Sequence, residues 1–275
     1  MKPAPFDYVR AESLDEALQV LAREGADARV IAGGQSLMPM LAMRLAKPTV
    51  LVDVMRLKPL AAPTREADAI VVPAAVRQAA LLAWPPLRTD QPLLAAALPW
   101  VGHYQTRARG TVCGSVAHAD PSAEIPLCLV AAEGEIRLRS RKRARRLPAE
   151  SFFAGTMMTE RQDDELIEAI TVPKARAGTG YAFAEVGRRH GDFAIVACAA
   201  VVDGTRMRLV VGGVADRPTA RDWPRLDGSA LDDALNELAW DLDARDDLHA
   251  SARYRRELVR RLGRKVLEEA RSCRG

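Results

Sequence analysis

The sequence predicts a mixed α+β fold in which a first module alternates strands with helices and a second module places two helices after its strands. Residues 29–54 contain a β-type run, an apolar helical stretch and a second β-type run, an alternation that favours an α/β arrangement for the N-terminal part. Residues 194–270 contain a predicted hairpin followed by two helices, which favours a separate module. Residues 174–180 resemble a linker, so we place the boundary there.

The first helix is marked at both ends. Ser13 and Glu16 have the spacing of a capping box, in which the serine accepts a backbone hydrogen bond and the glutamate reaches back. Apolar residues follow at helical spacing and stop before Gly25. Short strands are predicted at 29–32, 50–54 and 69–74, and Ser36 is the predicted N-cap of a helix over residues 37–45.

The middle of the chain carries weaker signals. Prolines divide residues 75–100 into two short helical segments. Residues 101–126 are rich in Gly, Ala, Ser and His with little periodicity, and we expect an irregular segment of the kind that often carries function. A surface hairpin is predicted over residues 135–147, and a strand over residues 165–172.

The second module has clearer elements. Residues 194–202 form an apolar run typical of a buried strand, Asp203-Gly204 has the composition of a hairpin turn, and residues 207–212 are the returning strand. Helices are predicted at 229–242 and 252–270, because each has its apolar residues on one side.

Composition and charge exclude several classes of protein. The 275 residues are 48% hydrophobic and 28% charged, values typical of a globular protein with room for one large domain or two ordinary ones. The net charge of +4 is local, because residues 137–146 hold seven basic residues and no acid, and the rest of the chain sums to −3. The chain has no apolar run long enough for a membrane span or a signal peptide, so we expect a cytoplasmic protein without membrane insertion.

The cysteines and histidines do not form metal-binding patterns. The four cysteines lie 15, 70 and 75 positions apart, and neither a CxxC pair nor an HxxxH spacing occurs. We therefore expect neither a metal site nor a disulfide framework in this chain.

Two glycine-bearing loops are the candidate ligand-binding segments. Ala32-Gly33-Gly34-Gln35-Ser36 leaves a predicted strand and enters a predicted helix, a geometry that suits a pyrophosphate or makes a simple tight turn. It does not match the dinucleotide or the P-loop fingerprint. Residues 109–121 combine small residues with Thr111, Ser115 and Asp120, which suit a sugar or polyol or cap an ordinary solvent loop.

Taken together, the two loops resemble the FAD-binding medium (M) subunit of the molybdenum-containing hydroxylases, the family of carbon monoxide dehydrogenase, xanthine dehydrogenase and quinoline oxidoreductase. The AGG(H/Q/T)S motif and the LxPxLxxRL that follows match residues 32–36 and 37–45, and TxGG(N/S) matches residues 111–115. Shorter matches occur at Phe6-Asp7-Tyr8, at Leu51-Val52-Asp53, at residues 164–167 and at residues 188–194. One departure is Cys113, which replaces a family glycine; either its φ is negative or the loop is altered.

The resemblance implies an α+β fold with a two-subdomain FAD-binding domain of the vanillyl-alcohol-oxidase (PCMH) type over residues 1–175, divided at about residue 56. A C-terminal domain like that of the CO dehydrogenase flavoprotein would follow over residues 176–275. The two motif loops would hold the FAD pyrophosphate and ribityl chain, Leu166 would pack beside the adenine or the flavin, Asp120 and Glu124 would bond the polyol, and Arg188 would approach the flavin. The implied cofactor-binding residues are Ala32, Gly33, Gly34, Gln35, Ser36, Leu37, Thr111, Gly114, Ser115, Asp120, Glu124, Leu166 and Arg188.

The resemblance also implies an oxidoreductase subunit that transfers electrons and has no catalytic acid or base of its own. Substrate, by weak preference an aromatic N-heterocycle, would be oxidised at a molybdopterin on a large partner subunit. Electrons would pass through [2Fe-2S] clusters on a small partner to FAD here and then to an external acceptor, in an assembly of (αβγ)2 type. The substrate and the acceptor (oxygen, NAD, quinone or cytochrome) stay open.

Two other functions are weighed against this one. A stand-alone FAD-dependent oxidoreductase would need acid or base groups over the flavin, with His103, His118, His190 and Tyr104 as candidates. A non-catalytic RNA- or protein-binding module would use the basic strip at residues 137–146, but no aromatic residue is interleaved there to stack on bases, so we do not expect nucleic acid as a partner.

Overall fold

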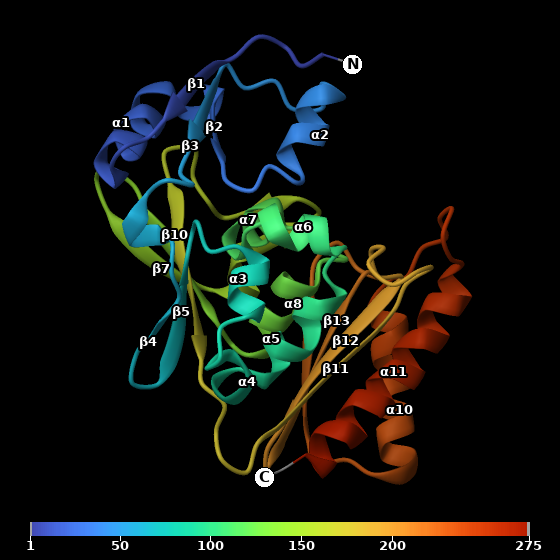
Figure 1. Ribbon diagram of the computed structural model, residues 1–275. Helices are drawn as coiled ribbons and strands as arrows, with labels where there is room; N and C mark the ends of the chain where they lie inside the picture. Colours follow the sequence, from blue (N-terminus) through green and yellow to red (C-terminus); the bar gives the residue numbers. More distant parts are fainter. Residues whose placement is uncertain (1, 274–275) are drawn as a thin grey trace.

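The computed structural model describes residues 2–273 and builds the chain around three main sheets (Figure 1). The first sheet holds β1 (Asp7–Arg10), β3 (Val50–Asp53) and β2 (Ala28–Ile31), in that order and all parallel. Helix α1 (Leu14–Glu24) joins β1 to β2 and buries its apolar stripe against the sheet. The predicted strand–helix alternation of this part is therefore confirmed.

The start of α1 shows how local sequence signals act. Ser13 Oγ accepts a hydrogen bond from the Glu16 amide at 3.1 Å, as predicted. The Glu16 carboxylate accepts from the Glu12 amide at 2.7 Å, one residue earlier than a standard capping box. Two otherwise unpaired donors are satisfied in this way, which fixes where the helix begins.

The second sheet is antiparallel, and its strand order is β4-β5-β10-β6-β7. Its strands are β4 (Thr64–Arg65), β5 (Ala69–Pro73), β6 (Glu135–Arg139), β7 (Ala144–Pro148) and β10 (Leu166–Pro173). The predicted hairpin corresponds to β6 and β7. Helix α9 (Ala149–Phe152) and the two-stranded ribbon of β8 (Phe153–Gly155) and β9 (Met158–Thr159) lie between β7 and β10 along the chain.

The helices that follow β5 correct the prediction for residues 75–100. Residues 75–100 form three helices in place of two, α3 (Gln78–Leu82), α4 (Leu87–Asp90) and α5 (Pro92–Ala97). Pro86 and Pro92 stand at helix starts, where a missing amide proton costs nothing. Short 3-10 turns complete the connections at Gly25–Asp27, Lys58–Leu60 and Leu98–Trp100.

The prediction that residues 101–126 are irregular is wrong. They contain α6 (Tyr104–Arg109), α7 (Val112–His118) and the start of α8 (Glu124–Ala131). All eight residues of α8 are buried, so this helix has no polar face and therefore no amphipathic period to detect.

The C-terminal part is a four-stranded antiparallel sheet in chain order, with two helices on one face (Figure 1). The strands are β11 (Gly180–Val186), β12 (Val196–Val202), β13 (Arg206–Gly212) and β14 (Thr219–Pro224), and the helices are α10 (Gly228–Asp241) and α11 (Ala252–Ser272). β12, β13 and both helices were predicted, whereas β11 and β14 were not. Within residues 2–273 no helix is long and apolar enough to cross a membrane.

Strand β12 joins the two parts of the molecule because both of its faces are buried. Ala197 and Ala199 belong to the core shared with α8, whereas Val196, Cys198 and Ala200 belong to the core shared with α11. Successive side chains of a strand point to opposite faces, so one apolar run serves both cores. The C-terminal sheet is thereby held against the helices that form the site.

Candidate functional site

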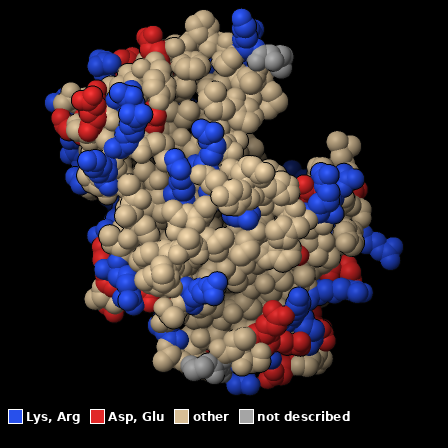
Figure 2. All heavy atoms as spheres, in the orientation of Figure 1, with Lys and Arg blue, Asp and Glu red and all other residues tan. Residues whose placement is uncertain are grey.

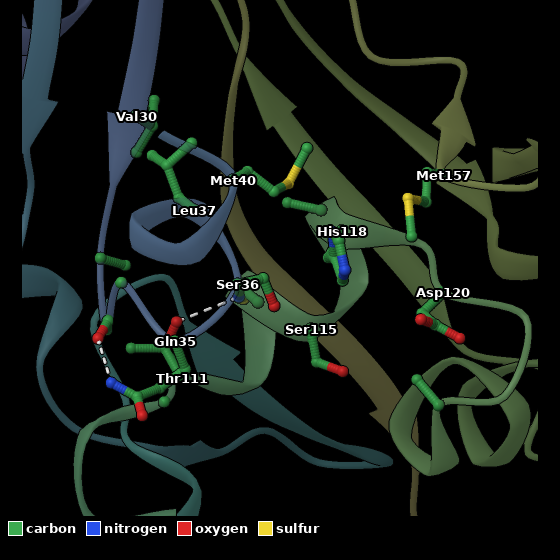
Figure 3. Close-up of a pocket in the computed structure, with 18 of the residues that line it drawn as sticks. Val30, Gln35, Ser36, Leu37, Met40, Thr111, Ser115, His118, Asp120 and Met157 are labelled. Carbon is green, nitrogen blue, oxygen red and sulfur yellow. Dashed lines mark hydrogen bonds between the residues drawn. The ribbon is translucent and has the colours of Figure 1, made fainter. Parts of the chain in front are cut away.

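A cavity of about 960 Å³ lies where the parts of the chain that carry the three main sheets meet. Its wall comes from the β2–α2 region, where α2 spans Leu37–Ala42, from α6 to the start of α8, from residues 157–167 and from residues 191–193. Figure 3 labels wall residues of the β2–α2 region, of α7 and its N-cap, and Asp120 and Met157. In Figure 2 the outline of the molecule is indented between the N-terminal part and the rest. The volume is at the upper end of the range for small-molecule and cofactor sites, about 300–1,000 Å³.

The first glycine loop contributes backbone to this wall. Gly34 has φ +70°, a conformation that favours glycine, and the Gln35 side-chain amide donates to the Gly33 carbonyl at 3.0 Å. A Cβ on Gly33 would lie 2.2 Å from the Arg109 carbonyl oxygen, so the first loop rests directly on the backbone that leads into the second. The two motif loops therefore form one continuous surface.

Helix α2 differs from its prediction. Ser36 stands at the N-cap position with helical backbone angles, and its hydroxyl makes no capping hydrogen bond. The helix ends at Ala42, before the predicted end at Leu45, and Arg44 has φ +58°. The hydroxyl of Ser36, which also lines the cavity, is not used to cap the helix.

The second loop is the start of α7. Thr111 is its N-cap, and Thr111 Oγ1 accepts from the Gly114 amide at 3.0 Å. Cys113 lies in the first turn of α7 and donates its thiol to the Val72 carbonyl at 3.3 Å. Its φ is not positive, so the glycine of the family motif is not required at this position.

A redox role for Cys113 finds no support in its surroundings. The thiol is buried, and burial raises its pKa to about 12. A reactive cysteine needs a thiolate near neutral pH, which this environment opposes.

The turn after α7 and the first residue of α8 each place a carboxyl group in the cavity wall. Asp120 accepts from the Ser122 amide at 2.8 Å, which fixes its side chain at the turn before α8. Glu124 is the first residue of α8 and only 5% exposed, and burial raises its pKa to about 7. Leu166, the buried first residue of β10, contributes apolar surface to the cavity wall.

All but one of the predicted site residues line the cavity. They are Ala32, Gly33, Gly34, Gln35, Ser36, Leu37, Thr111, Gly114, Ser115, Asp120, Glu124 and Leu166. Arg188 does not line it; the same loop contributes Gly191, Asp192 and Phe193 instead. Gly191 has φ +87° and packs against the Gly102 carbonyl, where a Cβ would lie at 2.7 Å. Of the histidines, His118 lines the cavity.

Sequence reasoning missed three basic residues in the wall, Arg29, Lys47 and Arg161. Arg161 donates to the carbonyls of Gln162 and Glu165 at 2.7 and 2.8 Å, which holds its guanidinium in place. Burial lowers the pKa of Arg161, and the charge of Arg29 lowers it further, so the two cations are near neighbours. They come from segments far apart in sequence, so no local motif indicates them.

The basic strip at residues 137–146 is largely paired with acids. Arg137 pairs with Glu66 at 2.9 Å, Arg139 with Glu168 at 3.2 Å and Arg145 with Glu165 at 2.7 Å. These acids come from neighbouring segments of the fold and offset the local charge that suggested an RNA-binding surface. On the face shown in Figure 2, basic and acidic groups are interspersed.

The cavity fits FAD in size and in chemistry. The glycine loops offer backbone without side chains, and Arg29, Lys47 and Arg161 place positive charge in the wall, where Arg29 and Arg161 also pair with Asp163 at 3.6 and 3.9 Å. The carboxyl groups of Asp120 and Glu124 match hydroxyl donors. Within residues 2–273, no group of three or more His, Cys, Asp or Glu side chains is placed to hold a metal ion.

The N-terminal and C-terminal parts of the chain each match a known protein family. Residues 4–175 match the family model of the FAD binding domain in molybdopterin dehydrogenase, and residues 181–270 match that of the CO dehydrogenase flavoprotein C-terminal domain. The chain is 34% identical to the 6-hydroxypseudooxynicotine dehydrogenase complex subunit alpha of Paenarthrobacter nicotinovorans, over 98% of this chain and 96% of that protein. It is 38% identical to the caffeine dehydrogenase subunit beta of Pseudomonas sp. (strain CBB1), over 78% of this chain and 73% of that one.

Solved structures agree with the sequence comparisons. The chain superposes on reconstituted CO dehydrogenase from Oligotropha carboxidovorans with a TM-score of 0.94 at 29% identity, covering 100% of both chains. It superposes on quinoline 2-oxidoreductase from Pseudomonas putida 86 with a TM-score of 0.91 at 31% identity, covering 99% of both. The chain therefore belongs to the FAD-binding medium subunits of the molybdopterin dehydrogenases.

Proposed function

We propose that this subunit binds FAD in the cavity between its three parts and passes electrons from the [2Fe-2S] clusters of a small partner subunit to an external acceptor. The observation that carries the proposal is the backbone contact between the two glycine loops, with Gly33 against the Arg109 carbonyl. Both loops line a cavity of suitable volume. The cytoplasmic location expected from the sequence stays a prediction.

Bound FAD supplies storage for two electrons, and the chain's own residues bind and orient it. The backbone amides of residues 33–36 and the hydroxyl of Ser115 are donors for the pyrophosphate and ribityl chain. Asp120 and Glu124 accept hydrogen bonds from hydroxyl groups of the FAD polyol, and Leu166 shields the adenine or the flavin ring from water. Arg29, Lys47 and Arg161 offset the phosphate charges. Arg188 lies outside the cavity wall, so we assign it no contact.

The substrate that we propose is an aromatic N-heterocycle, oxidised on a large molybdopterin subunit in an assembly of (αβγ)2 type. Relatives at 34–38% identity include proteins named for caffeine, nicotine and 6-hydroxypseudooxynicotine, all of which contain nitrogen heterocycles. Gln35 in the AGG(H/Q/T)S motif and Ser115 in the TxGG(N/S) motif are the variants that we associate with oxidation of heterocycles. Other relatives are named for carbon monoxide and glyceraldehyde, so the substrate needs a direct test.

The test is to purify the chain alone and together with the products of neighbouring genes, and to record absorption spectra. We expect a flavin spectrum from the chain alone, and bleaching by a heterocycle such as nicotine or quinoline only when the partners are present. A chain that takes up no FAD contradicts the proposal. Bleaching of the isolated chain by substrate would favour a stand-alone oxidoreductase, and bleaching of the complex by carbon monoxide but by no heterocycle would refute the substrate class.

A further inference from the structure

Exposed apolar side chains gather around the mouth of the cavity. Of the eleven large exposed apolar side chains within residues 2–273, four also line the cavity and so form its rim: Leu45, Met157, Met158 and Phe193. Three others lie on helices that contribute to the wall, or at the end of one of them: Met38, Met43 and Tyr104. Such a concentration of exposed apolar groups marks an interaction surface.

The rim borders the indentation in the outline of the molecule. In Figures 1 and 2 this indentation lies beside α2 and over one end of the C-terminal sheet. Leu45 follows α2 in the chain, and Phe193 lies in the loop between β11 and β12 of that sheet. The apolar groups therefore come from both sides of a concave surface, into which a convex partner fits.

A ligand inside the cavity covers only part of this surface. Met38, Met43 and Tyr104 are exposed but do not line the cavity, so FAD bound inside it leaves them in water. A partner that covers them together with the rim must span the mouth of the cavity. The occupant is therefore a macromolecule.

The charges beside the rim indicate the chemistry of this partner. Arg109, the last residue of α6, and Arg188, in the β11–β12 loop, are exposed, lie outside the cavity wall and form no ion pair within the part of the chain that the structure describes. Asp192 of the same loop is already paired with Arg189 at 3.0 Å. Unpaired cations favour a partner that places acidic side chains opposite them.

The apolar character of the rim favours a permanent partner over a transient one. Permanent interfaces are larger and more hydrophobic than the surfaces at which redox proteins meet briefly, and the external acceptor is a transient partner. Relatives of this chain are named as subunits of complexes. The subunit that delivers electrons has to lie at the opening of the cavity, because its cluster and the flavin must be positioned close to each other.

We propose that the rim and the apolar residues beside it are the docking surface for the small [2Fe-2S] subunit, and that the matching surface of that subunit is apolar at its centre and acidic at its edge. The proposal rests on the proposed function, since it takes FAD to be the occupant of the cavity and the small subunit to be its electron donor. Docking there also shields the mouth of the cavity from water.

The first experiment uses the assembled complex of the three subunits. Photoreactive benzoylphenylalanine in place of Met158 reports which chain covers the rim, and the same amino acid in place of Trp240 is the matched control. Trp240 is also large, apolar and exposed, but it lies on α10, which packs on the face of the C-terminal sheet opposite to α8.

After irradiation we expect position 158 to cross-link to the small subunit and position 240 not to do so. A cross-link from position 158 to the large subunit or to a second copy of this chain, or no cross-link at all, would overturn the proposal. A chain that binds no FAD would refute the proposed function itself, whereas a FAD-loaded complex with a cross-link to another chain refutes only the docking surface.

The second experiment measures the affinity of the FAD-loaded chain for the purified small subunit by calorimetry, with every variant compared at full flavin content. Met158→Glu should weaken binding about tenfold or more, because it places a charge in an apolar contact. Arg188→Glu should weaken binding mainly at low salt, since salt screens exposed charges. Trp240→Glu should bind like the natural chain.

Equal affinity of Met158→Glu and the natural chain for the small subunit would contradict the docking surface. If Met158→Glu does not fold, Leu45→Glu takes its place, and natural affinity in that variant would contradict the proposal equally. Equal loss of affinity in Trp240→Glu would also overturn it, because the apolar contact would then not be confined to the mouth of the cavity.

Discussion

Gly33→Ala tests directly the backbone contact between the two glycine loops. The added Cβ would lie 2.2 Å from the Arg109 carbonyl oxygen and 2.6 Å from the Gly110 Cα, both of them backbone atoms. Ordinary contact begins at 3.4 Å, so one loop must move by about 1 Å. No side-chain rotation relieves the clash, and the displaced segments are those that line the cavity.

The size of the effect follows from the cost of overpacking, about 1–3 kcal/mol. If the clash destabilises the arrangement of the loops that binds FAD by this amount, the affinity for FAD drops about 5- to 150-fold. Gly204→Ala is the matched control, because a Cβ at Gly204, in the turn between β12 and β13, meets nothing within 4 Å. Its FAD affinity should equal that of the natural chain.

Flavin fluorescence titration measures the affinity, and thermal unfolding of the FAD-free protein measures the stability. We expect weaker binding in Gly33→Ala, with or without a lower Tm. A Gly33→Ala protein with natural affinity and natural Tm would refute the reasoning, because it would show that the two loops are not in backbone contact.

Three further predictions concern the same cavity wall. Gly34→Val should abolish FAD retention on gel filtration, because a β-branched residue is a steric outlier at φ +70°; full flavin content would count against the first loop. Thr111→Val should destabilise the subunit by about 1 kcal/mol in urea unfolding, because the Gly114 amide loses its acceptor, whereas Thr111→Ser should retain stability; equal stability of Thr111→Val and the natural chain would contradict the cap. At pH 8 an aromatic disulfide reagent should label exposed Cys273 rapidly, and the buried Cys113, Cys128 and Cys198 only on unfolding; rapid labelling of Cys113 would show that its raised pKa does not hold.

The elements that the sequence predicted well are those with local signals. The first helix has its own cap at Ser13 and Glu16, and β12 is an apolar run followed by the Asp203-Gly204 turn. The glycine motifs were likewise found from short stretches. In each case the residues that determine the structure are neighbours in the chain.

The elements that were missed depend on tertiary contacts. α8 is buried on every side, so its sequence lacks helical periodicity. The 188–193 loop contributes Gly191 but not Arg188 to the cavity wall, and Gly191 packs against Gly102 from another part of the chain. Arg29 and Arg161 become neighbours only after folding.

The cavity wall is assembled from stretches as distant as residues 26–48, 101–124, 157–167 and 191–193, so it exists only in the folded chain. A ligand that binds only the folded chain stabilises it by mass action, by about 2.7 kcal/mol when its free concentration is a hundred times Kd. Typical domains are stable by only about 5–15 kcal/mol, so this is a substantial share. In a cell short of flavin, the subunit would therefore unfold more often and be degraded faster, and the supply of cofactor would set the amount of the protein as well as its redox state.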